Sequence, residues 1–462
     1  MNRRKLLQGA AALATLLPVT GLHRRANADL PALPHPVLVH TMMLGGPDFR
    51  HLLPPAYTSD PNSYGNAFYR VRASALRIDA TPAAWEAHWR SAYIPLDDGR
   101  TGFGMLAGCD WLANMWRAGN VAIVANVVGA ESRDHEHAQR VWESADRSLS
   151  QVSSPRTGWG GRVADATGGN VFSLTPTPRP FCFNRNPDDV LSPGTNRVIT
   201  LADPRAIGLF TPQQTAEPTA LGIHRALQQY YAAVDATLPA GAPQRQFTGH
   251  EQQLRALGNR LRPLFDSLVL PAEIVGLTSG PGALATRPLA AQVTNLYHAL
   301  AAAQEVEFRS ASLAFGNWDS HDLQQSEIEP KLRDMFGAQG AFAQLYRVLP
   351  DNVSSRLVLM FSGEFGRQLR ANGDAGTDHG RGNCVLLVGL PVRGGIYGDL
   401  FPSAELARLD EPTPDIDGRT ELDALLAPLV DYLAPGTAST VLPVHASASV
   451  EAGVTLSRLF RG

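Results

Sequence analysis

The stretch Pro36-Val-Leu-Val-His-Thr-Met-Met-Leu44 decides the fold, because it is almost wholly apolar and ends at Gly45-Gly46. A short apolar run closed by glycines predicts a strand buried in the core. Val121–Val128 (Val-Ala-Ile-Val-Ala-Asn-Val-Val) has the same character and ends at Gly129. Strands that are apolar along their whole length are typical of a sheet covered by helices on both faces.

The rest of the chain alternates between strand and helix patterns. Further strands are predicted at residues 306–315, 356–361 and 383–390. Helical patterns cover residues 106–118, 135–145, 220–237, 246–268, 288–305, 329–349 and 421–433. This alternation predicts an α/β fold in which helices flank a largely parallel sheet.

One long segment, residues 147–218, lacks such patterns. It is dense in Ser, Thr, Pro, Gly and Asn, which predicts a loop-rich, irregular excursion. Long loops in compact domains are often functional. No shift in composition marks a boundary after the first 28 residues, so residues 29–462 are predicted to form a single domain.

Composition and charge exclude several classes of protein. The 462 residues are 44% hydrophobic and 18% charged, which is enough for a large core and excludes a disordered polyelectrolyte. Forty basic and 43 acidic residues give a formal charge of −3, which argues against a dedicated nucleic-acid binder. Three widely spaced cysteines allow at most one disulfide, and buried free thiols are the preferred interpretation; they are Cys109, Cys182 and Cys384.

The N-terminus has the features of an export signal. Residues 2–7 read Asn-Arg-Arg-Lys-Leu-Leu, and an apolar run to Leu22 is followed by Ala26-Asn27-Ala28. Twin arginines, a short apolar run and a small-x-small site predict a twin-arginine signal peptide over residues 1–28. No later stretch reaches ~18 apolar residues, so we expect a periplasmic or secreted protein without a stable membrane anchor.

Candidate metal ligands stand at the ends of the predicted strands. They are Asp48, His135, Asp319, His321, Glu364, Asp378 and His379. Ligands bind at the carboxyl ends of strands in open α/β sheets, so these side chains are expected to meet. Bringing the carboxylates together without a cation would be strongly repulsive, which implies a divalent metal or raised carboxyl pKa values. The residue types suit Zn, Mg, Mn, Fe or Ca.

The order of these motifs resembles the bacterial DUF1501 family. The matching residues are Leu44–Asp48, Ser132–His135, Gly158–Arg162, Trp318–His321, Glu364–Arg367, Asp378–Gly380 and Arg393–Gly398. That family is grouped with the alkaline phosphatase and sulfatase superfamily. The resemblance implies a three-layer sandwich with one or two divalent metals at the strand ends, where a nucleophile at a helix N-terminus attacks a phosphate or sulfate ester.

The resemblance also assigns roles to single residues. Asp48 resembles the first-strand ligand, Asp319 and His321 the acidic and imidazole pair, Glu364 the third-strand carboxylate and His379 the late ligand. The family commonly has Arg-Ser-His where this chain has Arg133-Asp134-His135.

Three catalytic candidates follow from this comparison. Asp134 stands in the serine position and is a nucleophile, a metal ligand or a helix N-cap. Ser132 is the alternative nucleophile. Arg367, like Arg162, is a candidate clamp for an anionic substrate.

Two functions fit these observations. One is a metal-dependent hydrolase of small anionic phosphate or sulfate esters. The other is a non-catalytic binding or assembly protein that kept the fold and lost the nucleophile. Family members tend to be encoded beside another exported family, DUF1800, which implies an exported DUF1800-type protein partner.

Overall fold

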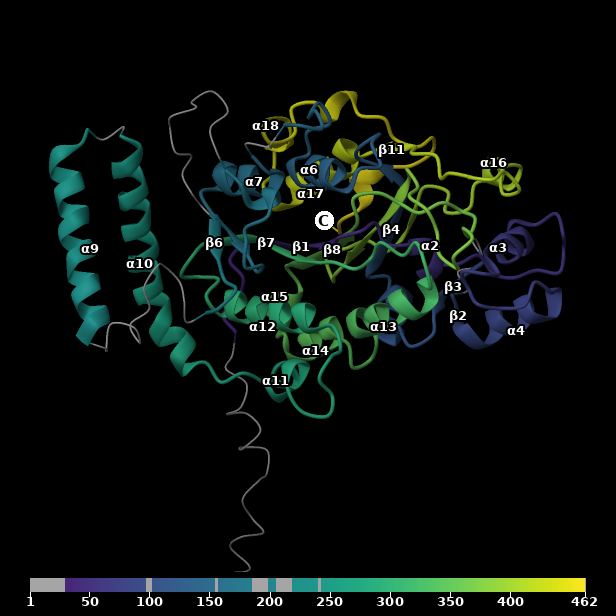
Figure 1. Ribbon diagram of the computed structural model, residues 1–462, viewed down its shortest axis with the longest axis horizontal. Helices are drawn as coiled ribbons and strands as arrows, with labels where there is room; N and C mark the ends of the chain where they lie inside the picture. The colour runs from purple at the N-terminus through teal and green to yellow at the C-terminus, as the bar shows by residue number, and fades with distance from the viewer. Residues whose placement is uncertain are drawn as a thin grey trace, which may run out of the picture.

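A computed structural model describes residues 30–96, 102–153, 157–184, 198–204, 218–239 and 242–461 (Figure 1). The predicted signal peptide at residues 1–28 lies outside the described residues. The helices that the structure defines are α2 (Phe49–Leu52), α3 (Tyr64–Arg72), α4 (Pro82–Ala92), α5 (Asp110–Arg117), α6 (His135–Ser144), α7 (Trp159–Thr167), α9 (Pro218–Thr237), α10 (Pro243–Ser267), α11 (Ala272–Thr278), α12 (Arg287–Ala301), α13 (Gln324–Phe336), α14 (Ala341–Val348), α15 (Asp351–Ser354), α16 (Ser403–Leu406), α17 (Leu422–Leu433) and α18 (Ala438–Val441). Short 3-10 turns lie at Pro180–Cys182, His445–Ser447 and Leu456–Arg458.

Within these residues, nine strands form one sheet in the order β10-β4-β9-β8-β1-β7-β5-β6, with β11 paired to β4. The strands are β1 (Val37–Met43), β4 (Val121–Val128), β5 (Asn170–Ser173), β6 (Val198–Thr200), β7 (Phe308–Phe315), β8 (Leu357–Ser362), β9 (Asn383–Val388), β10 (Gly395–Tyr397) and β11 (Thr420–Glu421). A separate hairpin joins β2 (Tyr93–Leu96) to β3 (Phe103–Leu106).

The strand at residues 37–43 lies at the centre of the sheet, as its sequence suggests. Strand β1 is buried at every position and pairs in parallel with both β7 and β8. Strand β9 is the exception in the parallel core, because it runs antiparallel to β4 and β8. The predicted α/β fold with a mostly parallel sheet is therefore confirmed.

Helices cover both faces of the sheet (Figure 1). On one face, α5, α11, α12, α13 and α14 pack apolar side chains such as Leu112, Leu296 and Phe336 into the larger core. On the other face, α7, α17 and α18 contribute side chains such as Val163, Leu425 and Val441 to a second core. The sheet thus buries side chains on both faces, which explains why its central strands lack polar alternation.

Three predicted segments need correction. The segment predicted as irregular, 147–218, lies partly outside the described residues, and its described part contains α7, β5 and β6, whose two strands belong to the main sheet. These strands are four and three residues long, too short for a periodic signal. The single helix predicted at 329–349 is two helices, α13 and α14, which are separated at Gly337 and Gly340. The helix predicted at 106–118 begins only after β3.

Helices α9 and α10 form an antiparallel pair that stands beside the main body (Figure 1). Their positions agree with the helices predicted at 220–237 and 246–268. Among the described helices, none is both long and apolar enough to cross a bilayer.

The three cysteines are buried and free, as predicted. Burial raises the pKa of the Cys384 thiol to about 11, although the nearby Arg50 charge acts in the opposite direction. These thiols therefore stay protonated and behave as small core side chains.

Replacing Arg77 with glycine is expected to stabilise the protein. Arg77 is exposed and has φ 53°, a left-handed backbone that a residue with a Cβ adopts at a cost. Arg77→Gly should raise the free energy of unfolding by about 0.5–1 kcal/mol, measured by urea denaturation. Ala87→Gly, at an exposed position in the interior of α4, is the control and should lower it by about 1 kcal/mol. An equal loss in both variants would contradict the strain at Arg77.

Candidate functional site

The strand order brings several predicted side chains to one edge of the sheet. Asp319 and His321 follow β7, and Glu364 follows β8. His135 begins α6, just after β4, and His379 precedes β9. Because β9 is antiparallel to its neighbours, the start of β9 lies at the carboxyl end of β4, where Asn383 pairs with Val127. A residue before a strand thereby reaches the same edge as residues after strands.

Four of these residues, the histidine–aspartate cluster, converge on one point: His135, Asp319, His321 and His379. The Nε2 atoms of His321 and His379 each lie 3.0 Å from Asp319 Oδ1, and 2.9 Å from one another. His135 Nε2 lies 3.2 Å from the other carboxylate oxygen, Asp319 Oδ2. One oxygen or nitrogen each from His135, Asp319 and His379 lie within 4.8 Å of one another.

The opposite nitrogen of each ring, Nδ1, faces an oxygen that can only accept a hydrogen bond. The pairs are His135 with Glu364 Oε1 at 2.7 Å, His321 with Asp378 Oδ1 at 3.0 Å and His379 with the Arg133 carbonyl at 3.0 Å. These partners assign the proton to Nδ1, so each neutral ring presents the lone pair of Nε2 to the cluster. Carboxylates and carbonyls behind histidines hold metal-binding rings in this way.

Without a cation or a shared proton, the Nε2 lone pairs and the Asp319 carboxylate oxygens face one another, and all of them are hydrogen-bond acceptors. Two imidazole lone pairs 2.9 Å apart repel, and the Asp319 carboxylate adds a negative charge beside them. Zinc binds histidine nitrogen at about 2.0–2.1 Å, so two nitrogens on one ion can lie about 3 Å apart. The donor set and its spacing therefore fit a divalent metal ion.

Arg367 holds Asp319 in its ionised form. Burial acts to raise the Asp319 pKa, but the hydrogen bond and charge of Arg367 outweigh it and lower that pKa to about 2. Arg367 is itself buried, and it donates to the carbonyls of Gly46, Thr377 and Trp318. Its guanidinium donates its hydrogen bonds to groups of the protein itself. This differs from the prediction that Arg367 clamps an anionic substrate.

The two ends of the cluster differ in proton affinity. The hydrogen bond to Glu364 raises the His135 pKa, although burial acts to lower it. Burial lowers the His379 pKa, and the hydrogen bond to Asp319 only partly offsets this. His379 is therefore neutral at pH 7 and available as a ligand.

Replacing Glu364 with glutamine is expected to lower the His135 pKa, because a neutral amide stabilises an imidazolium less than a carboxylate does. The titration of the ring, followed by NMR, is the measurement. Glu136→Gln is the control, because that exposed carboxylate lies on the same helix and pairs only weakly with Arg140. An unchanged His135 pKa in Glu364→Gln would show that Glu364 does not set the charge of this ring.

Glu364 and Asp378 lie behind the rings and do not join the cluster, contrary to the prediction that they bind metal directly. Glu364 Oε1 accepts hydrogen bonds from Gly45 N, His135 Nδ1 and Gln139 Nε2. Asp378 Oδ1 accepts from His321 and from Asn372 Nδ2. Their carboxylates thus orient histidines.

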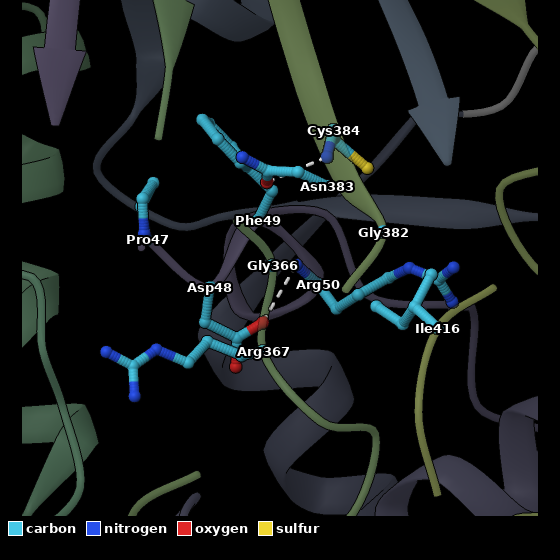
Figure 2. A pocket seen from close by; sticks show the side chains of 10 residues that line it. All are labelled: Pro47, Asp48, Phe49, Arg50, Gly366, Arg367, Gly382, Asn383, Cys384 and Ile416. Carbon is cyan, nitrogen blue, oxygen red and sulfur yellow. Dashed lines mark hydrogen bonds between the residues drawn. The ribbon is translucent and has the colours of Figure 1, made fainter. Parts of the chain in front are cut away.

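Asp48, predicted as the first-strand ligand, lies elsewhere. Figure 2 shows it beside a small cavity, with its carboxylate directed at the start of α2. It accepts hydrogen bonds from the backbone N–H groups of Arg50 and His51 and forms a buried ion pair with Arg72. Asp48 follows a tight turn after β1, in which Gly45 has φ 122° and lies so close to the exit of β7 that a Cβ would be 2.4 Å from Asp319 N.

The two nucleophile candidates make local hydrogen bonds at the start of α6. Asp134 is the N-cap of α6 and accepts a hydrogen bond from His137 N at 2.8 Å. Ser132 Oγ in turn accepts from Asp134 N at 3.1 Å. Of the three roles left open for Asp134, the N-cap is the one that the contacts support. Arg162 donates to the carbonyls of Val441 and Ser144, so it joins the C-terminal segment to α6.

Sequence reasoning missed two glutamines beside the site. Gln139 donates to Glu364, and its four-residue spacing from His135 on α6 was the available signal, since such residues share a helix face. Gln324, the first residue of α13, contacts Ser320, Thr377 and Asp48. No sequence pattern singles it out.

The model of DUF1501, described as a protein of unknown function, matches residues 296–408. This range includes Asp319, His321 and His379, whereas His135 lies outside it. No curated protein matches the chain. The predicted resemblance to DUF1501 is therefore confirmed over residues 296–408, which match that family of unknown function.

Proposed function

We propose that the histidine–aspartate cluster binds one divalent transition-metal ion and that the protein uses it to hydrolyse phosphate or sulfate esters. The observation that carries the metal site is the 2.9 Å contact between the Nε2 atoms of His321 and His379, beside Asp319. With both Nδ1 atoms bonded to acceptors, a cation is the partner that satisfies all three groups.

The ligand types favour particular ions. Three imidazoles and one carboxylate suit Zn, Fe or Mn better than Mg or Ca, which prefer oxygen ligands. Zinc is the ion to test first, because it binds three or four such ligands in proteins.

The cluster is open to a small molecule. The side chains of Asp319 and His321 are 41% and 43% exposed. A bound ion would polarise the ester and lower the pKa of a water molecule. Asp134 caps α6 and Ser132 accepts a hydrogen bond from the Asp134 backbone, so we infer that water rather than either side chain attacks the ester.

The test begins with the metal content of the purified protein and its titration with zinc. We expect about one equivalent per chain, removed by a chelator and restored by zinc, as for other sites with this donor set. Nitrophenyl phosphate, bis-nitrophenyl phosphate and nitrophenyl sulfate are then compared with and without zinc. Hydrolysis that is lost with the chelator supports the proposal, and a protein that binds no divalent ion contradicts it.

A second candidate is a non-catalytic metal-binding or assembly protein. The capping role of Asp134 favours it, because that position would otherwise supply the nucleophile. Stoichiometric zinc with no hydrolysis of any of the three esters would select this candidate. An exported DUF1800-type protein is then the proposed partner, and co-purification of the two from the periplasm is the test.

We further propose export through the twin-arginine pathway, on the strength of Arg3-Arg4 and the apolar run that follows. Replacing both arginines with lysine should leave the protein in the cytoplasm, as measured by fractionation. Normal export of that variant would contradict the proposal.

A further inference from the structure

We propose that Gln324 is a positioning residue, which holds the two segments that carry the cluster in register with each other. The inference rests on the proposed metal site, since it states what sets the geometry of that site. One segment is residues 319–321, after β7, and the other is residues 377–379, before β9. They are far apart in the sequence, and Gln324 contacts both.

The side-chain carbonyl of Gln324 joins the two segments. Its Oε1 accepts a hydrogen bond from Ser320 Oγ at 3.1 Å and another from Thr377 Oγ1 at 2.5 Å. Ser320 lies between Asp319 and His321, and Thr377 directly precedes Asp378 and His379. A movement of this one oxygen therefore displaces residues on both sides of the cluster.

The other end of the amide is fixed by Asp48. Gln324 Nε2 donates to Asp48 Oδ2 at 2.8 Å, and the same carboxylate is paired with Arg72. This contact requires a donor on one side of the Gln324 side chain and an acceptor on the other, which glutamine supplies. Asp48, predicted from sequence as a metal ligand, thus acts on the cluster through Gln324.

Water cannot easily replace these contacts. Gln324 and Thr377 are fully buried, and Ser320 and Asp48 are 3% exposed. The surrounding backbone bonds depend on the same arrangement, since Thr377 N donates to the Ser320 carbonyl and Gln324 N to the Ala375 carbonyl. Leucine at position 324 would leave buried hydroxyl groups and a carboxylate oxygen without this partner, and glutamate would place an oxygen against Asp48.

Zinc affinity separates a positioning role from a purely structural one. We expect Gln324→Leu and Gln324→Glu to bind zinc about 10–100-fold more weakly, the loss typical of groups that orient metal ligands. Gln344→Leu is the matched control, because that buried glutamine bonds to Gln339 and Arg347 on α14 and its flank. It should lower the melting temperature but keep the wild-type zinc affinity.

Thr377→Val supplies a second variant in the same contact. It removes one hydroxyl that Gln324 accepts and should also weaken zinc binding. Because both changes break one shared hydrogen bond, the double variant with Gln324→Leu should lose less affinity than the sum of the two single losses. Strict additivity would overturn the proposed coupling.

Hydrogen exchange of the metal-free proteins gives a readout that does not depend on zinc. Gln324→Leu should accelerate exchange at residues 319–324 and 372–378, whereas Gln344→Leu should not. Unchanged exchange there, or wild-type zinc affinity in Gln324→Leu, would overturn the inference. If the wild-type protein binds no zinc, the proposed function fails, and the exchange result alone decides the role of Gln324.

Discussion

Replacing Arg72 with methionine is expected to lower the free energy of unfolding by about 3–5 kcal/mol, because it leaves a buried carboxylate without its counter-charge. Arg72 is 0% exposed and pairs with Asp48, which is also buried. The guanidinium donates further hydrogen bonds to the carbonyls of Leu369 and Gln368. Methionine fills a similar volume but satisfies none of these acceptors.

The matched control is Arg70→Met on the same helix, α3. Arg70 pairs with Asp410 at the surface, where both side chains are exposed. Surface ion pairs contribute about 0–1 kcal/mol, so this variant should stay close to the wild-type stability. Urea denaturation of the three proteins is the measurement, and equal losses in both variants would refute the special role of Arg72.

The acid limb of the same experiment tests the charge on Asp48. Burial acts to raise the Asp48 pKa, but the Arg72 charge outweighs it, so the folded pKa lies below the ordinary value of 3.8. The stabilisation from this pair is therefore full above pH 3.8 and is lost as the pH falls through the folded pKa. In Arg72→Met the carboxyl protonates at higher pH, so the gap between the two stability curves should narrow on acidification.

Replacing His379 with alanine is expected to weaken zinc binding by more than about 100-fold, because losing a group that merely orients a ligand already costs about 10–100-fold. His379 Nε2 is within 3.0 Å of both Asp319 Oδ1 and His321 Nε2. Its removal takes away one of the three cluster members whose candidate ligand atoms all lie within 4.8 Å of one another. Zinc titration against a competing chelator gives the affinity.

The control for this ligand is His137→Ala. That imidazole lies on α6, two residues beyond His135, but its Nε2 bonds to the carbonyl of Leu149. Its loss should leave the zinc affinity unchanged.

Thermal unfolding gives a second measurement of the site. Zinc should stabilise the wild-type protein by about 2.7 kcal/mol at a hundredfold excess over Kd, and His379→Ala should lose this stabilisation. A zinc response retained by His379→Ala would remove His379 from the site.

Much of the fold was readable from local pattern. Central strands such as β1 and β4 are predictable because they are almost wholly apolar, as expected for strands that are buried at every position. Helices such as α12 and α17 are predictable because apolar residues recur along one face. The short strands β5 and β6 gave no such signal, and their place in the sheet follows from pairing with β7 and with each other. Pairing of that kind is a property of the folded chain and leaves little trace in three or four residues.

The site divides in the same way. The residues of the cluster were all found from the sequence, since each stands at a strand end and carries a metal-binding side chain. The sequence could not predict which of the seven candidate ligands meet in space. A rotation about one side-chain bond, or a tight turn in the backbone, is enough to point a carboxylate elsewhere. Asp48 faces Arg72, while Glu364 and Asp378 turn toward the Nδ1 atoms of histidines.

The sequence by itself determined the α/β class, the order of the motifs and the set of chemical groups available at the sheet edge. Tertiary structure decided their roles, and it did so through contacts between segments distant in the chain. The antiparallel course of β9 brings His379 to the exits of parallel strands. Gly45 allows the turn after β1 to pack closely against the backbone of Asp319. Gln324 joins the segment that contains Ser320 to the segment that contains Thr377. Such contacts depend on burial and on hydrogen-bond geometry between distant segments. Residue types and their spacing along the chain do not specify that geometry.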